Sequence, residues 1–457
     1  MDVFVPRNGI FLTLKIMIKK IFSGVRAILL LLVGVYFFLI PAGMLIYDLR
    51  DPGLRTSDIP QFAYRWHAQL SAGFAAWAND RVTRQRASKL NMHDISGTEW
   101  PMFSAVYYLW ATESLQRGWE RQSGGRTDMP KVYAKPAIDA AIKLILDPDN
   151  ATWVKAHWGD DYLARENVFY RMLLIAGLTS YQALSGDDQY RSLLQSQVER
   201  LSSEFDASPY GLLDDYPGEC YPVDVLPAIA VIHRAGVVLG QDYTAFVARS
   251  LRAFEQTRLQ AETALPTYNV DAKSGQGYGY ARGVGIAYML IWAPELWPDV
   301  AAQWYDRFEA HFWINNPSIG GIREFPKNSG VDDYFFEVDA GPIIHGFGAG
   351  ASAFGLGAAM VNGRFDHAYV LATEALVASW PLPDGTLLIP RILSNFSDAP
   401  YLGEMAMLFI MTREPTKPDV SSSEVNMPYV VYLALLGYVM LGAGCILKAR
   451  KLVRKQG

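Results

Sequence analysis

The stretch WGDDYLARENVFYRMLLIAGLTSYQAL, residues 158–184, contains the pattern that decides the fold. A loop rich in acidic, glycine and aromatic residues leads directly into a long apolar segment. Apolar residues occupy nearly every face of that segment when it is drawn as a helix, as they do in helices buried among other helices. The stretch therefore predicts a buried helix with carboxylates gathered at its N-terminal end.

The same pattern recurs along the chain about every 60 residues, a period typical of stacked helical hairpins. The other acidic or glycine-rich loops are found at residues 93–100, 214–222, 275–283, 332–342 and 397–404. Segments that are apolar nearly all round follow at 103–115, 225–239, 285–293 and 343–360. Segments that mix charged and apolar residues at helical spacing lie between them, at 187–204, 242–260 and 298–313.

These segments predict an all-α fold, an (α/α)6 toroid of six helical hairpins. The apolar segments would form the inner ring and the amphipathic ones the outer ring, with Ile59–Leu90 as the first outer helix. An open helical solenoid is the alternative. The even count of six loops and the absence of polar capping repeats favour closure.

Apolar runs without charge lie near both ends of the chain. Ala27 to Tyr47 and Pro428 to Leu447 are each long enough to cross a hydrocarbon core, which needs about 20 residues. Basic residues lie outside both runs, so the positive-inside rule places both termini in the cytoplasm. A cleaved signal peptide is the alternative for the first run, although the run is longer than most such segments.

We therefore expect five regions in an inner-membrane protein whose main domain is extracytoplasmic or periplasmic. They are a basic cytoplasmic N-terminus (1–26), a transmembrane helix (27–47), the (α/α)6 domain (48–426), a second transmembrane helix (427–447) and a basic cytoplasmic tail (448–457).

Composition excludes several classes of protein. The 457 residues are 51% hydrophobic, which excludes a disordered chain, and two cysteines exclude a disulfide scaffold. The net charge is −5, and without the basic ends the main domain carries about −14. A nucleic-acid partner is therefore not expected. The lipid bilayer and a small-molecule or glycan substrate are the expected partners.

In a toroid, the loops that lead into the inner helices gather at one end, so their carboxylates would share one site. Crowding and burial separate the pKa values of neighbouring carboxylates, so that one can donate a proton while another accepts one. The candidate catalytic residues are Glu99, Asp160, Glu166, Asp214, Asp215, Asp224 and Asp339. The candidate substrate-binding residues are His93, Trp100, Trp158, Tyr170, Tyr221, Tyr278 and Tyr334.

Simpler roles remain open for several of these residues. Asp160 and Asp214 precede predicted helices, where a single carboxylate often serves only as an N-cap. Cys220 is the one thiol of the main domain, and a lone cysteine is more often buried and structural than nucleophilic. No HExxH, EF-hand, phosphate-binding or dinucleotide-binding motif stands in a suitable context, so neither a metal nor a cofactor is expected.

Residues 150–310 contain a series of motifs that resembles the linalool dehydratase-isomerase family. The series is Trp158-Gly159-Asp160, Glu166-Asn167-Val168-Phe169-Tyr170-Arg171, Gly177-Leu178, Tyr181-Gln182, Leu184, Gly186, Tyr190, Gly211-Leu212, Tyr221, Ala228 and Asp242-Tyr243. The resemblance implies an (α/α)6 barrel that adds or removes water at an allylic alcohol by acid–base chemistry.

The chain departs from that family at the residues that do the chemistry. The family's catalytic histidine falls at Leu173 and a nearby methionine at Phe169. The family's two active-site cysteines fall near Asp214 and Asp224, and Cys220 matches neither. The alignment thus implies that carboxylates replace a thiol and imidazole site.

Three functions remain open at this point. The first is a hydro-lyase acting on an isoprenoid or other lipid-like alcohol. The second is a polysaccharide hydrolase, lyase or epimerase of the cell envelope that uses paired carboxylates. The third is a glycan-binding or scaffold module without catalysis, which the dense acids and aromatic residues disfavour.

Overall fold

The computed structural model describes residues 7–87, 95–121, 128–255, 259–331, 334–337, 340–396, 400–417 and 425–454. Two candidate site residues, His93 and Asp339, lie outside the described residues. The described part is mainly helical, as the sequence predicts, and has only short strands.

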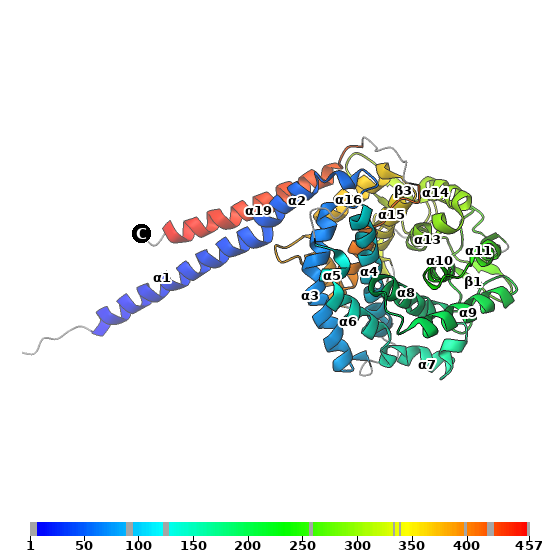
Figure 1. Ribbon diagram of the computed structural model, residues 1–457. Coiled ribbons are helices and arrows are strands. Elements are labelled where there is room, and N and C mark those ends of the chain that lie inside the picture. The colour runs from blue at the N-terminus through cyan, green and yellow to red at the C-terminus, as the bar shows by residue number, and fades with distance from the viewer. Residues whose placement is uncertain are drawn as a thin grey trace, which may run out of the picture.

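The molecule consists of a rounded body and a two-helix stalk that projects from it (Figure 1). One side of the stalk is a nearly continuous helix, made of α1 (Arg7–Val33), a π-helical turn η1 (Gly34–Leu39) and α2 (Ile40–Asp48). The other side is α19 (Tyr429–Arg454), which lies alongside α1, so both ends of the chain point the same way.

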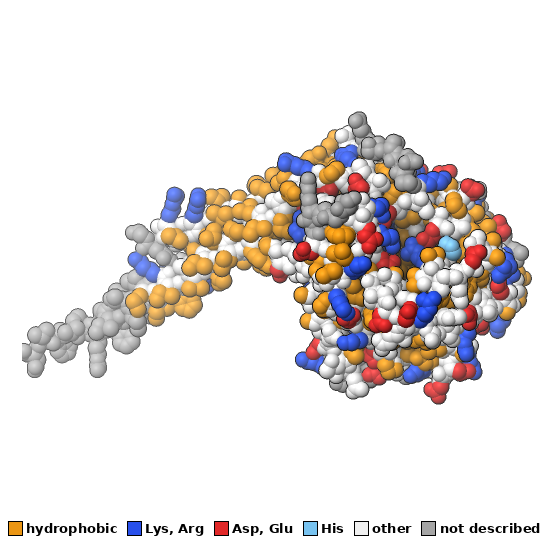
Figure 2. All heavy atoms as spheres, in the orientation of Figure 1, with side chains coloured by type: hydrophobic (Ala, Val, Ile, Leu, Met, Phe, Trp, Pro, Cys, Tyr) orange, Lys and Arg blue, Asp and Glu red, His pale blue; other side chains and the backbone are white. Residues whose placement is uncertain are grey.

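The stalk has the composition of a membrane-spanning pair. Met17–Asp48 and Tyr429–Arg454 are long and apolar enough to cross a bilayer. Their outward-facing side chains are largely hydrophobic, and Lys and Arg side chains appear toward the free end of the stalk (Figure 2). A third apolar helix, Pro222–Leu239, is two-thirds buried inside the body and is a core helix. The protein is therefore a membrane protein.

Glycines allow the two stalk helices to approach closely. A Cβ atom added at Gly34 would lie 2.8 Å from the Cβ of Cys445 and 3.0 Å from the carbonyl oxygen of Gly442. One added at Gly442 would lie 2.6 Å from the Cγ of Leu39. Small residues at such crossings let backbones pack in lipid, where no hydrophobic force drives helices together.

Polar contacts attach the base of the stalk to the body. The indole Nε1 of Trp380 donates to the carbonyl of Phe37 at 2.7 Å, and the Tyr438 hydroxyl donates to the carbonyl of Val377 at 3.0 Å. Asp48 forms a 2.6 Å ion pair with Arg65. These contacts fix the body against the stalk.

Six helices of the body contact one another in succession. α4 contacts α8, which contacts α10, and contacts continue through α13, α15 and α18 back to α4. Their bounds are Ile95–Arg121, Val168–Ser185, Pro222–Leu239, Gly283–Leu296, Ala349–Val361 and Leu402–Met411. Most of their described side chains are buried, as expected for helices that are apolar on most faces.

More amphipathic helices pack against the outside of these six. They are α3 (Gln61–Thr83), α6 (Lys135–Ile145), α9 (Arg191–Ala207), α11 (Thr244–Ser250), α14 (Pro298–Phe312) and α16 (Phe365–Ser379). Shorter helical pieces are η2 (Pro52–Leu54), α5 (Pro130–Tyr133), η4 (Pro148–Ala151), α7 (Thr152–Trp158), η5 (Tyr162–Ala164), α12 (Arg252–Glu255) and α17 (Leu388–Asn395).

Proline and glycine set several helix ends. Pro222 and Pro298 occupy first helical positions, where a missing N–H costs nothing. Gly186 and Gly240 adopt left-handed conformations at the C-caps of α8 and α10, with φ of 69° and 74°. Glycine has no Cβ to strain in this region of backbone space.

Small antiparallel sheets stand in the loops before two inner helices. β1 (Asn269–Asp271) pairs with β2 (Gln276–Tyr278) before α13. Between α14 and α15 are β3 (Trp313–Asn315) paired with β4 (Gly320–Ile322), and a sheet of β5 (Tyr334–Glu337), β6 (Gly341–Ile344) and β7 (Phe347–Gly348).

One predicted helix boundary is wrong. The sequence pattern predicts a helix throughout 343–360, but residues 341–344 and 347–348 form strands and the helix begins at Ala349. Gly341 and Gly346 have φ of 72° and 77°, and His345 has φ of 52°. Three left-handed residues in six are incompatible with a right-handed helix.

Candidate functional site

Three carboxylates meet where inner helices begin. Glu99 lies in the first turns of α4, Asp224 in the first turn of α10, and Asp215 in the loop before α10. Glu99 and Asp215 are buried, at 7% and 2% exposed. Both Asp224 and Glu99 act electrostatically on Asp215, so the three form one charged group, the carboxylate cluster.

Asp215 is the most perturbed member of the cluster. Burial raises its pKa well above the usual value, and the charge of Asp224 raises it further. The backbone N–H of Phe169 in the first turn of α8 donates to Oδ1 at 2.8 Å. Oδ2 has no hydrogen-bond partner among the described residues. Burial and the neighbouring charges thus favour the protonated form of Asp215, while backbone hydrogen bonds from Phe169 and Tyr221 act in the opposite direction.

Tyr216 connects two members of the cluster. Its hydroxyl donates to Oε2 of Glu99 at 3.4 Å, and burial together with Glu99 and Asp215 raises its pKa. The neighbouring Cys220 is 1% exposed, and burial followed by the surrounding carboxylates raises the pKa of its thiol. A thiol kept protonated in this way is a poor nucleophile, which agrees with a structural role.

Aromatic side chains from several inner helices pack beside the cluster. Phe103 of α4 contacts Phe169 of α8 edge-on at 5.5 Å between ring centroids and Tyr288 of α13 at 6.0 Å. Tyr107 of α4 stacks on Phe103 at 4.2 Å, and Phe354 of α15 lies 5.0 Å from Tyr288. The surroundings of the carboxylates are therefore largely apolar.

Two tyrosine hydroxyls in this aromatic group are unusual. The hydroxyls of Tyr107 and Tyr288 lie close together; burial raises the pKa of each, and the charge of Asp224 raises it further. Within the described residues the two hydroxyls interact with each other, and that of Tyr288 also interacts with Trp292, but neither makes a hydrogen bond of ordinary geometry. Buried polar groups with poorly formed hydrogen bonds are costly, so such a pair near a carboxylate favours a ligand that would pair with them.

Glu166 and Asp214 hold the backbone of the site. Oε2 of Glu166 accepts the N–H of Asp214 at 2.7 Å, and Oδ2 of Asp214 accepts the N–H of Gly218 at 2.7 Å. Burial raises the pKa of both carboxyls, while these bonds lower it. Each of the two acids thus stabilises, through a backbone hydrogen bond, the loop that carries Asp215.

A buried arginine supports the same region from behind. Arg171 of α8 is fully buried, pairs with Glu204 of α9 at 2.8 Å and donates to the carbonyls of Arg165 and Glu166 at 3.2 Å. Its position fixes the turn before α8. The sequence offers a weak signal for this role, since a charged residue stands inside an otherwise apolar helix.

The structure places Asp160, Trp158 and Tyr170 in three different environments. Asp160 is exposed in the turn after α7, outside the carboxylate cluster. The indole of Trp158 donates to the carbonyl of Asp215 at 3.0 Å, so Trp158 positions the acid. Tyr170 is 3% exposed and packs on Tyr162 at 5.6 Å, within the core rather than at a surface.

The other aromatic candidates are more accessible. Trp100 is half-buried on α4, next to Glu99. Tyr221 donates to Glu219 at 2.8 Å and packs edge-on against Tyr268. Tyr278 of β2 is 46% exposed and interacts electrostatically with Asp271 and Glu219. Tyr334 of β5 is 53% exposed, and its hydroxyl is hydrogen-bonded to the His345 ring. Tyr221 and Tyr278 therefore lie near the loop of the cluster, and Tyr334 belongs to a separate sheet.

Sequence reasoning missed Tyr107 and Tyr288. Both stand inside apolar segments, FSAVYYLWATESL and GIAYMLIWA, whose pattern indicates the core alone. The available signal was a tyrosine hydroxyl within a helix that has no polar face on which to place it.

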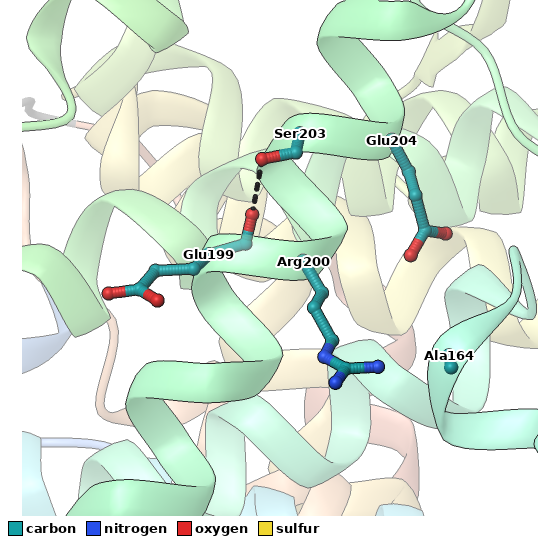
Figure 3. Close-up of a pocket in the computed structure, with 5 residues that line it drawn as sticks. All are labelled: Ala164, Glu199, Arg200, Ser203 and Glu204. Carbon is teal, nitrogen blue, oxygen red and sulfur yellow. Dashed lines mark hydrogen bonds between the residues drawn. The ribbon is translucent and has the colours of Figure 1, made fainter.

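An open depression of about 360 Å³ lies between α9 and η5, lined by Ala164, Glu199, Arg200, Ser203 and Glu204 (Figure 3). Arg200 and Glu204 extend toward Ala164, and Glu199 points the other way. Since Glu204 already pairs with the buried Arg171, the carboxylate that lines this depression has a structural partner.

Among the described residues, no three His, Cys, Asp or Glu side chains are placed to hold a metal ion together. Comparison of the chain with models of known protein families finds no match, and comparison with curated proteins finds none either. The site is therefore interpreted from its own geometry.

Proposed function

We propose that the protein is a membrane-anchored enzyme that breaks or forms C–O bonds by acid–base catalysis at the carboxylate cluster. The observation that supports this best is Asp215, a buried acid with one free oxygen, beside Asp224 and Glu99 and within an aromatic surround. We also propose that the six successive inner helices form the inner ring of an (α/α)6 toroid, as the resemblance to linalool dehydratase-isomerase implies.

The reaction that fits best is removal of water from an alcohol, or the reverse addition. Protonated Asp215 donates its proton to the substrate hydroxyl, and the C–O bond breaks with water as the leaving group. Asp224 or Glu99 stabilises the cation that develops and then accepts a proton from the adjacent carbon, giving an alkene. Transfer of that proton back to Asp215 restores the enzyme.

The hydroxyls of Tyr107 and Tyr288 would hold the substrate oxygen in place. Each can donate one hydrogen bond, and neither has a protein partner of ordinary geometry among the residues described. Aromatic neighbours such as Phe103 and Phe354 favour a hydrocarbon chain over a charged one. A lipid-like alcohol that enters from the bilayer beside the stalk suits both features.

A second function is supported by the half-exposed aromatic residues near the cluster. Tyr221 and Tyr278 are suited to stack on sugar rings, and paired carboxylates perform glycoside hydrolysis in many enzymes. The alternative is therefore an envelope polysaccharide hydrolase, lyase or epimerase. With either function the body lies outside the cytoplasm and both termini inside, since Lys19, Lys20 and Lys448 lie toward the free end of the stalk.

The test uses the full-length protein in lipid nanodiscs and oxygen-18 water. A panel of isoprenoid alcohols and envelope polysaccharides is incubated with the protein, and product masses are measured. Loss of unlabelled water from an alcohol supports the hydro-lyase. Label in shortened glycans establishes hydrolysis and contradicts the hydro-lyase.

Two variants make the result specific to the cluster. Asp215→Asn should abolish turnover. The matched control Asp160→Asn, which makes the same exchange at an exposed aspartate outside the cluster, should keep it. Equal activity of Asp215→Asn and the wild type would refute catalysis at the cluster.

A further inference from the structure

The short helix α17 (Leu388–Asn395) has an outward face without polar groups. Ile389, Ile392, Leu393 and Phe396 follow the spacing i, i+3, i+4, i+7, so they lie on one side of the helix. All four are exposed, and Phe396 is 88% exposed and Leu393 56%. A solvated helix of a globular protein normally turns such a face toward the core.

Two polar residues of α17, Arg391 and Ser394, point the opposite way. Arg391 pairs with the fully buried Glu404 of α18, and the Ser394 hydroxyl accepts the N–H of Gly403 at 2.7 Å. Ser394 also donates to the carbonyl of Pro390 at 2.8 Å. The helix therefore turns the Arg391 and Ser394 side chains toward the body and its exposed hydrocarbon side chains outward. This is the reverse of the usual arrangement in a helix that faces water.

A short chain of contacts connects α17 to the apolar stalk. The N–H of Leu388 donates to the carbonyl of Trp380 at 3.1 Å, and the Trp380 indole donates to the carbonyl of Phe37 at 2.7 Å. The Trp380 ring also packs against Tyr438 of α19 at 5.1 Å. Phe37 and Tyr438 both belong to the candidate membrane spans, so α17 begins next to a residue, Trp380, that contacts both spans.

We propose that α17 is inserted in the bilayer next to the two spans, with its outward face among the acyl chains of the adjacent leaflet. This inference rests on the membrane anchoring in the proposed function and not on its chemistry. Lipid is the occupant that fits, because the four exposed side chains carry no charge and α17 is joined through Trp380 to the apolar stalk.

The inference is tested by the collision of spin labels with oxygen, which partitions into lipid, and with a water-soluble nickel chelate. Full-length Cys445→Ala protein is labelled at Phe396→Cys and placed one molecule per nanodisc of phosphatidylcholine. Labels at Leu433→Cys on α19 and Val237→Cys on α10 serve as controls, since both side chains are exposed, at 66% and 74%, on the stalk and the body. Unchanged thermal midpoints verify that the labelled proteins fold.

We expect the ratio of oxygen to nickel accessibility at residue 396 to match that at 433 and to exceed that at 237 several-fold. A ratio at 396 equal to that at 237, with 433 still oxygen-rich, would overturn the inference and leave the anchoring intact. Low ratios at both 396 and 433 would overturn the anchoring and the inference together. Low accessibility of residue 396 to both reagents would instead indicate that another part of the same chain covers it, and would also overturn the inference.

Discussion

Replacing Asp215 by asparagine should make the protein more stable at neutral pH while it removes activity. Burial and the charge of Asp224 raise the pKa of this carboxyl well above its value in the unfolded chain. The folded state therefore binds a proton that the unfolded state releases. Stability contributed by the protonated acid is fully present below the unfolded pKa and is lost as the pH rises through the folded pKa. Asparagine has no such proton to lose.

The size of the effect follows from the same proton. Relative to Asp215→Asn, the wild type loses about 1.4 kcal/mol of folding free energy for each pH unit above the unfolded pKa. Between pH 4 and pH 6 the difference grows to ~3 kcal/mol while the folded acid stays protonated. A body of roughly 380 residues has an unfolding entropy of ~0.8 kcal/mol/K, so the midpoint should rise by about 3–4 °C.

The assay is thermal unfolding of full-length protein in one detergent at pH 4, 5, 6 and 7. The amide oxygen of the asparagine in Asp215→Asn can still accept the Phe169 N–H, and the side chain keeps its size. Asp160→Asn, at an exposed position, is the matched control and should change the midpoint at no pH. A midpoint of Asp215→Asn below that of the wild type at pH 7 would refute the reasoning, since it would mean that the ionised carboxylate is stabilising.

Three further predictions concern other parts of the chain. Gly442→Leu should separate the stalk helices, because even a Cβ there would lie 2.6 Å from Leu39. Double electron–electron resonance between labels on α1 and α19 should then show a broader distribution of distances. Glu374→Gln should flatten the fall in stability between pH 4.5 and 7, because burial raises the pKa of Glu374 to about 7; an unchanged pH profile would contradict this. Arg171→Met should lower the free energy of unfolding, measured in urea, by about 3–5 kcal/mol, because it breaks the pair between buried Arg171 and Glu204. An unchanged free energy of unfolding would mean that the pair contributes nothing.

The sequence is informative about the helices because their apolar residues occupy every face. The pattern predicts α8 at 168–184, and the helix is observed at Val168–Ser185, since a single uninterrupted pattern defines it. The prediction fails just before α15, because Ile343 and Ile344 are equally apolar in a strand and in a helix. Only the left-handed backbone at Gly341, His345 and Gly346 distinguishes the two.

The candidate site was predictable in its acids but not in its aromatic part. Asp215 and Glu99 could be proposed because carboxylate doublets and acidic loops are visible in the sequence. Their neighbours Tyr107 and Tyr288 come from segments about 180 residues apart, and nothing local marks their hydroxyls as unpaired. Which acids are buried also depends on packing, as Asp160 and Asp215 show.

The sequence by itself determined the composition-driven features of this protein: apolar runs near both ends, a helical body and acidic loops at a regular period. Hydrophobic periodicity and charge are properties of neighbouring residues, so they can be read along the chain. Only the tertiary structure decided which carboxylates share one charged group, which way α17 faces and how Gly34 meets Gly442. Those features depend on contacts between distant segments and on burial, which fix pKa values and exposed faces and have no counterpart in local sequence.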